Sequence, residues 1–179
     1  MVAFFFKIAI IIPMSENFDE LKRMMESLPE EERQALFEKM RNEVKNTSIS
    51  HNETNDKLKR ILIVDDLGVI TFQLEMMFLK NNYEVTVSQE IYDAITKYKT
   101  GTFDLVIIDL FIPTEREGFL LLDELRKMAQ IRKQNTQIGV ITASAKKEHK
   151  IACHQKGVSF YMEKSNNWQK ELLDICSKL

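Results

Sequence analysis

Residues Ile61–Ile70 read ILIVDDLGVI: four apolar residues end in two adjacent aspartates, and a helical pattern of apolar residues follows. An apolar run of this length without alternation is typical of a strand that is buried on both faces, as in parallel sheets. Two like charges side by side disfavour each other's ionised form. Asp65 and Asp66 therefore mark the end of this strand as a candidate functional site.

The same strand–helix unit recurs four more times before the end of the chain. Apolar runs predict the strands, and the amphipathic stretches after them predict the helices. The pairs are Ile61–Val64 with Val69–Lys80, Val85–Val87 with Glu90–Tyr98, Leu105–Ile108 with Gly118–Ile131, Ile138–Ile141 with Lys147–Lys156, and Val158–Tyr161 with Asn167–Lys178. Right-handed crossovers then give a doubly wound α/β domain with a parallel sheet.

Polar residues follow the predicted strands, where the crevice of such a sheet lies. They are Asp65 and Asp66 after the first strand, Asp109 after the third, Thr142 at the end of the fourth and Lys164 after the fifth. Three clustered carboxylates share protons or hold a hard cation such as Mg²⁺. A lysine and a hydroxyl both suit phosphate oxygens. We therefore expect a carboxylate that acts as a nucleophile toward phosphorus.

This set resembles the receiver domain of two-component response regulators, over about residues 58–179. The residues that carry the resemblance are Asp65-Asp66, Asp109 within DLFIP, Thr142 within ITAS, and Tyr161 three residues before Lys164. The resemblance implies a flavodoxin-like five-stranded sheet of order 2-1-3-4-5. It also implies that Asp109 accepts a phosphoryl group from a sensor histidine kinase or a histidine phosphotransfer protein. A signalling protein is expected, not a turnover enzyme.

The resemblance assigns a Mg²⁺ site to the aspartates. Asp66 would bind the ion directly, Asp65 would help mostly through water, and Asp109 and the backbone carbonyl of Phe111 would complete the protein ligands.

The resemblance further assigns a phosphate contact and a switch. Lys164 would pair with the acceptor carboxylate and later with the phosphate. The Thr142 hydroxyl would move toward the phosphoryl group, and the ring of Tyr161 would turn inward into the vacated space.

Three local features depart from the common receiver pattern. Ser165 follows Lys164 where proline is usual, so we expect a trans peptide and a re-aimed loop. The segment Pro113–Gly118 (PTEREG) is one residue longer than the commonest form. Phe111 and Ser144 flank the acceptor, and a bulky ring at Phe111 should hinder water and lengthen the lifetime of the phosphoaspartate.

The first 57 residues lie outside this resemblance. Residues 14–46 predict a helical hairpin that packs on the main domain, on a second copy to form a dimer, or on a partner, and residues 47–57 predict a linker. Residues 1–13, MVAFFFKIAIIIP, are apolar but too short to span a bilayer. Three interpretations remain open for these residues: a mis-assigned translation start, a packed strand, or an anchor at the membrane interface.

The composition limits the classes of partner and the cellular compartment that we expect. The net charge is −2, without a concentrated basic face, so no nucleic acid is expected. Two cysteines, Cys153 and Cys176, without metal-like spacing fit a reducing cytoplasm. Because the last predicted helix ends at the chain end, we expect no C-terminal effector domain, and output through contacts with an unknown protein target.

Two alternatives remain beside the phosphoacceptor. The first is an adaptor on the same fold that works without phosphorylation. The second is a haloacid-dehalogenase-like phosphatase, which needs a second aspartate two residues after the nucleophile, where this chain has Phe111. An FMN-binding flavodoxin is less favoured, because DDLG follows the first strand in place of a loop rich in serine and threonine.

Overall fold

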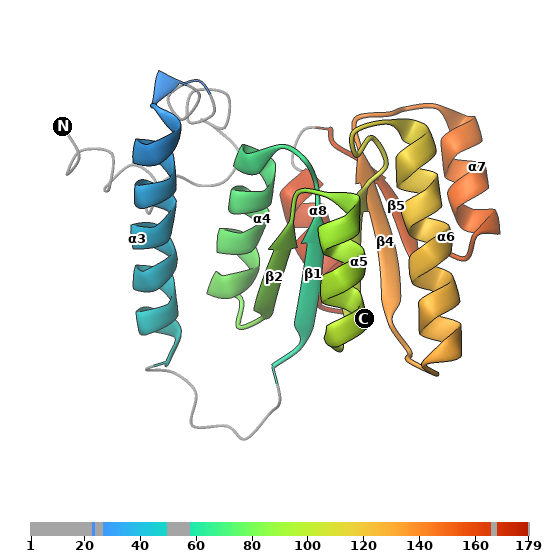
Figure 1. Cartoon of the computed structure of the whole chain (residues 1–179), viewed down its shortest axis with the longest axis horizontal. Helices are drawn as coiled ribbons and strands as arrows, with labels where there is room; N and C mark the ends of the chain where they lie inside the picture. Colours follow the sequence, from blue (N-terminus) through green and yellow to red (C-terminus); the bar gives the residue numbers. More distant parts are fainter. Residues whose placement is uncertain (1–22, 24–26, 50–57, 166–167, 179) are drawn as a thin grey trace.

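The computed structural model describes residues 23, 27–49, 58–165 and 168–178 (Figure 1). A five-stranded parallel sheet has the order β2-β1-β3-β4-β5. The strands are β1 (Arg60–Val64), β2 (Glu84–Ser88), β3 (Leu105–Asp109), β4 (Gln137–Thr142) and β5 (Phe160–Glu163). The helices are α3 (Glu30–Ile49), α4 (Gly68–Lys80), α5 (Ile91–Thr100), α6 (Glu115–Ile131), α7 (Lys147–Gln155) and α8 (Trp168–Cys176). The predicted fold class and strand order are confirmed.

The sheet is the middle of three layers. In Figure 1, α4 and α8 cover one face, and α5, α6 and α7 cover the other. Alternate residues of β1 divide between two cores, with Leu62 and Val64 facing one and Ile61 and Ile63 facing the other. All four are fully buried, which explains why the strand is apolar throughout.

Most element boundaries differ from the sequence prediction by one to three residues, and two of these differences have a clear local cause. Helix α6 begins three residues before Gly118, because the Thr114 hydroxyl caps it by accepting from the Glu117 N–H. Gly118 lies inside this first turn, where an added Cβ would stand 2.0 Å from the Leu110 carbonyl oxygen. Strand β5 begins at Phe160, because the Val158 N–H still bonds the carbonyl of Cys153 at the end of α7.

Helix α3 packs lengthwise along α4 (Figure 1). The ring of Phe37 stacks on Phe72 with centroids 3.8 Å apart, and Met40, Met76 and Leu79 are buried beside them. The second helix of the predicted hairpin therefore packs on the main domain. It continues to Ile49, beyond the expected boundary at residue 46, because no glycine or proline stops it.

The remaining predictions for residues 1–57 fall largely outside the described residues. These are the apolar residues 1–13, the first helix of the hairpin and most of the linker. Within the part of the chain that the structure describes, no helix is both long and apolar enough to cross a bilayer. Both cysteines are free and buried, and burial raises the pKa of the Cys153 thiol to about 11 and that of Cys176 to about 12.

Candidate functional site

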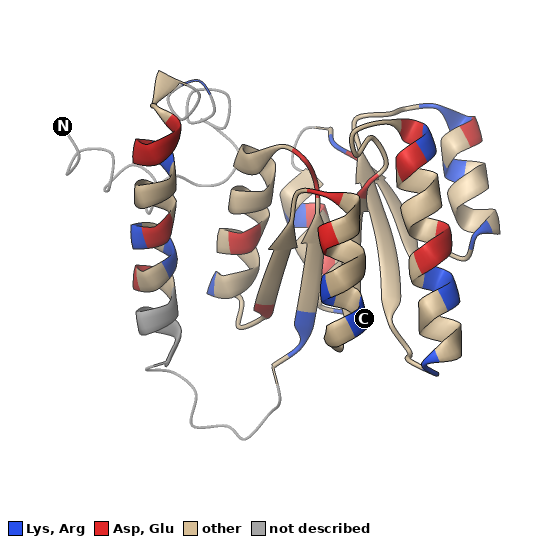
Figure 2. Cartoon of the chain, in the orientation of Figure 1, with Lys and Arg blue, Asp and Glu red and all other residues tan. Residues whose placement is uncertain are grey.

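The register of the sheet brings two aspartates together at one edge. Val64 of β1 pairs with Ile108 of β3, so the next residue of each strand, Asp65 and Asp109, emerges beside the other. Asp65 is 1% exposed and Asp109 is 6% exposed. Figure 2 shows acidic segments in the loops at this end of the sheet. Two adjacent carboxylates in a nearly dry position need a cation.

Lys164 supplies that positive charge. Its Nζ lies 2.7 Å from Oδ2 of Asp65 and 2.7 Å from Oδ2 of Asp109. The backbone places it there, because Thr142 pairs with Glu163 on β5 and the Lys164 N–H donates to the Thr142 carbonyl at 2.7 Å. The side chain then extends past β4 to reach the ends of β3 and β1.

Burial and charge shift the pKa values at this cluster. Burial raises the pKa of Asp65, against the opposing effect of Lys164. For Lys164, burial acts to lower the pKa, but the two carboxylates outweigh it and raise the pKa above its usual value. With both carboxylates ionised, the three side chains carry a net charge of −1, so the site still attracts a cation.

The other proposed metal ligands lie at the rim of the site. Asp66 is exposed, and among the described residues the ion pairs of Lys164 are with Asp65 and Asp109 and not with Asp66. Phe111 is 36% exposed, and its N–H donates to Oδ1 of Asp109 at 3.1 Å. Within the described residues, no three carboxylates, histidines or cysteines form a ready metal cluster. Lys164 instead bridges Asp65 and Asp109.

This donor set still fits Mg²⁺. The ion prefers oxygen ligands, keeps several of its waters, and takes only one or two protein carboxylates together with substrate phosphate. Asp65, Asp66 and Asp109 offer only oxygens at the ends of adjacent strands, and the cluster has a negative charge left over. A compact cluster of three carboxylates is therefore not required.

The predicted switch residues both contact Ser144. Thr142 is fully buried, and its Oγ1 accepts a hydrogen bond from the Ser144 N–H at 3.3 Å. Tyr161 is partly buried, and its hydroxyl donates to the Ser144 carbonyl at 2.9 Å. Burial raises the pKa of Tyr161, so this hydroxyl keeps its hydrogen for donation. The peptide bond after Lys164 is trans, as expected; the cis peptide bond found among the described residues is Ile112–Pro113.

Sequence reasoning missed a buried histidine beside this site. His149 of α7 lies between the Ser144 hydroxyl and the carboxylate of Glu115, with its Nδ1 2.6 Å from Ser144 Oγ and its Nε2 3.1 Å from Glu115 Oε1. The spacing of Ser144 and His149 along the chain is a weak signal. The contact with Glu115 depends on how α6 packs beside α7, which no local pattern reveals.

The family follows from a comparison over most of the chain. Residues 61–176 match the model of the response regulator receiver domain. The chain belongs to this family. Receiver domains are signalling modules that act with histidine kinases and phosphotransfer proteins, and aspartate phosphorylation and Mg²⁺ binding are general features of the family. The resemblance seen in the sequence is confirmed.

Individual relatives agree with this assignment. The transcriptional regulatory protein KdpE of Staphylococcus aureus is 30% identical over 110 residues, which cover 60% of this chain and 44% of KdpE. The chain spans less than half the length of the curated relatives that it matches. A CheY-like receiver domain protein of Methanospirillum hungatei superposes with a TM-score of 0.60 at 27% identity, covering 68% of this chain and 94% of that one.

A second solved structure, which shares the fold, contains a metal ion. A response regulator of Burkholderia pseudomallei contains a phosphorylated aspartic acid, a calcium ion and citrate. It superposes with a TM-score of 0.56 at 20% identity, covering 67% of this chain and 72% of its own chain. At this identity the likeness shows the shared fold only.

Proposed function

We propose that this receiver domain accepts a phosphoryl group on Asp109 from the phosphohistidine of a sensor histidine kinase or a histidine phosphotransfer protein. The observation that carries this proposal is the position of Lys164 Nζ, 2.7 Å from a carboxylate oxygen of both Asp65 and Asp109. A carboxylate paired with a lysine that also binds a second carboxylate, at the carboxyl ends of the strands of a parallel sheet, suits nucleophilic attack on phosphorus.

In the transfer step, an oxygen of Asp109 attacks phosphorus as the bond to the histidine nitrogen breaks, and that nitrogen keeps the bonding electron pair. One oxygen of Asp109 already accepts from the Phe111 N–H and the other from Lys164, so the carboxylate is held in place before attack. Lys164 then exchanges its contact with Asp109 for a phosphate oxygen, which keeps its charge paired.

We propose that Asp66, Asp65, Asp109 and the Phe111 carbonyl hold Mg²⁺ during this step. When bound, the ion neutralises charge on the phosphoryl oxygens. Asp66, as the exposed member, is open to solvent and to an incoming hydrated ion. The buried Asp65 has one oxygen on Lys164 and the other on the Leu67 N–H at 2.9 Å, which fits a contact through water.

We propose output through protein contacts, either on the face formed by α7, β5 and α8 or through the N-terminal helices. The predicted N-terminal hairpin, whose second helix continues to Ile49, would then be an interaction module joined to the receiver domain by a linker. Ile151 of α7 is 57% exposed on the first of these surfaces, and an exposed apolar side chain suits a protein partner.

The test is incubation with acetyl phosphate and Mg²⁺, followed by intact mass measurement. We expect one phosphoryl adduct on the wild type and none on Asp109→Asn, which keeps the shape of the side chain. Asp123→Asn is the matched control, because Asp123 pairs with Lys156 on the surface, and it should keep the adduct. A wild type that takes no phosphoryl group from acetyl phosphate or from candidate kinases would favour the phosphorylation-independent adaptor.

A further inference from the structure

His149 lies between the two loops that flank Asp109. It is 5% exposed. Its Nδ1 lies 2.6 Å from Oγ of Ser144 in the β4–α7 loop, and its Nε2 lies 3.1 Å from Oε1 of Glu115 in the first turn of α6. The ring of Phe111, in the β3–α6 loop, packs against it with centroids 5.8 Å apart. One buried side chain therefore contacts both loops.

The hydrogen bonds around His149 form one directed chain. An ionised Glu115 can only accept, so Nε2 carries the hydrogen and donates to it. The Ser144 Oγ accepts from the Lys146 N–H at 3.3 Å, which leaves the hydroxyl hydrogen free to be donated to Nδ1. The chain runs from Lys146 through Ser144 and His149 to Glu115, and each member has a suitable partner.

Ser144 is also where the predicted switch residues meet. Its N–H donates to Thr142 Oγ1 at 3.3 Å, and its carbonyl accepts from the Tyr161 hydroxyl at 2.9 Å. A Thr142 hydroxyl that shifts toward a phosphoryl group on Asp109 must break its bond with Ser144 or pull the loop with it. The bond from Ser144 to His149 opposes that movement, because the helix holds His149.

We propose that His149 is a positioning residue that holds the β4–α7 loop in its unphosphorylated arrangement and ties that loop to the first turn of α6. The inference rests on the proposed function of Asp109. Phosphorylation loosens the bond between Ser144 and His149, and the change reaches α6 through Glu115.

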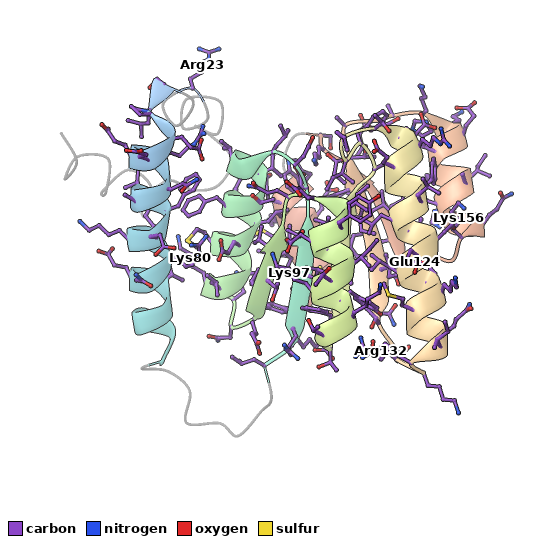
Figure 3. All side chains as sticks on the ribbon, viewed as in Figure 1. Arg23, Lys80, Lys97, Glu124, Arg132 and Lys156 are labelled. Carbon is purple, nitrogen blue, oxygen red and sulfur yellow. The ribbon has the colours of Figure 1, made fainter. Side chains whose placement is uncertain are left out.

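The C-terminal end of α7 is also linked to α6, at the middle of that helix. Lys156, at the C-terminal end of α7 (Figure 3), lies 2.6 Å from Oδ1 of Asp123 and over the ring of Phe119 at 5.8 Å. The same Phe119 ring stands edge-on to His149, with centroids 6.3 Å apart. Through these contacts, a change in the position of His149 would reach both α6 and α7.

Beryllofluoride, a noncovalent mimic of the phosphoryl group, tests this inference by calorimetry in the presence of Mg²⁺. His149→Phe keeps a ring between Phe111 and Phe119 but removes both nitrogens, and Ser144→Ala removes the partner hydroxyl. We expect each variant to bind beryllofluoride roughly fivefold more tightly than the wild type, because the bound state no longer has to give up one hydrogen bond.

Two matched variants control the experiment. Ser144→Thr keeps the hydroxyl, and His154→Phe places the same ring at an exposed position of the same helix; both should bind beryllofluoride with wild-type affinity. A merely structural role for His149 would lower the melting temperature without tightening beryllofluoride binding. If His149→Phe does not fold, Ser144→Ala decides the question.

The outcomes separate this inference from the proposed function. Unchanged or weaker beryllofluoride binding by Ser144→Ala, with normal binding by the wild type, overturns the role of His149 and leaves Asp109 as the acceptor. A wild type that binds no beryllofluoride and gains no phosphoryl adduct overturns both.

Discussion

At the scale of single residues, Lys164 binds two carboxylates in the structure and is expected to bind a phosphoryl oxygen once Asp109 is phosphorylated. It neutralises Asp65 and the proposed acceptor Asp109, and its side chain is only 10% exposed. A buried charge of this kind is a poor source of stability by itself but is costly to leave unpaired. The lysine therefore couples the stability of the receiver domain to the state of its site.

Replacing Lys164 by methionine should destabilise the protein by about 3 kcal/mol without Mg²⁺, because two buried carboxylates lose their cation. Added Mg²⁺ should restore part of the loss. Urea unfolding with and without Mg²⁺ measures both effects. Lys156→Met is the control, since its partner Asp123 is exposed and such pairs contribute about 0–1 kcal/mol. Equal losses in the two variants would contradict the structural argument.

Phe111 should slow the loss of the phosphoryl group. Phe111 follows the proposed acceptor by two residues and is 36% exposed, and we expect its bulky apolar ring to keep water from the phosphoaspartate. Phe111→Asn should hydrolyse about tenfold faster, which corresponds to about 1.4 kcal/mol in the barrier. Mass measurement of phosphoryl decay gives the rate. Phe111→Leu, which keeps an apolar side chain, should lose its phosphoryl group at the wild-type rate. A wild-type rate in Phe111→Asn would contradict the hypothesis.

Residues of this site differ in how far the sequence could predict them. Asp65 and Asp109 could be placed together, because strand ends in a parallel sheet meet at one edge. Their shared contact with Lys164 depends on the register of three strand pairings and on the reach of a long side chain. No sequence pattern predicts this contact, and only the resemblance to receiver domains indicated it. The contact between His149 and Glu115 depends on helix packing alone, so no spacing predicted it.

At the scale of elements, the first turn of α6 approaches the end of β3 unusually closely. Gly118 makes this approach possible, because any Cβ there would meet the backbone of Leu110. The turn carries Glu115, and the loop before it carries Phe111, so the glycine fixes one wall of the site. A side chain at this position would push the whole turn outward.

Gly118→Ala should therefore destabilise the protein by about 1–3 kcal/mol, as overpacking does, and should shift the position of Glu115. Urea unfolding measures the loss. Gly68→Ala is the matched control, because its Cβ would meet only the flexible amide end of Gln89 at 3.1 Å. We expect that control to be nearly neutral. A neutral Gly118→Ala would show that the helix can move away without penalty.

Removing one partner of the ion pair between Arg41 of α3 and Glu75 of α4 should destabilise the protein strongly. Two nitrogens of Arg41 bind the two oxygens of Glu75 at 2.6 and 2.7 Å, and the Glu75 side chain is 8% exposed. Arg41→Met should cost about 2–3 kcal/mol in urea unfolding, because it leaves a buried carboxylate unpaired. The double variant Arg41→Met with Glu75→Leu should recover most of this loss. A double variant as unstable as the single one would contradict the ion-pair account.

The ten elements of the receiver domain were predictable because each has its own local signal. Apolar runs predicted the strands and amphipathic stretches predicted the helices, and only the ends of these elements differ. The turn after α7 delays the start of β5, and Thr114 caps α6 early. Helix α4 differs from the other helices of the domain in how widely it is buried. It is apolar on every side, and such a helix must be covered all round. The packing of α3 on its outer face supplies that cover.

At the scale of the whole molecule, α3 is therefore a structural part of the described fold. It buries Phe72, Met76 and Leu79 of α4, each of which is less than 10% exposed in its presence. Without α3, these side chains would form one contiguous apolar patch on the outside of the receiver domain. Such patches drive association in soluble proteins.

Deleting residues 1–57 should leave a receiver domain that self-associates and unfolds at lower urea concentration. Light scattering over a range of concentrations would detect the association, and the full chain provides the reference. The shortened chain with Met76→Lys should return toward a monomer, because a charge interrupts the patch. If the shortened chain stays monomeric at all concentrations and keeps full stability, α3 does not cover this face in solution, and the N-terminal helices are free to serve a partner instead.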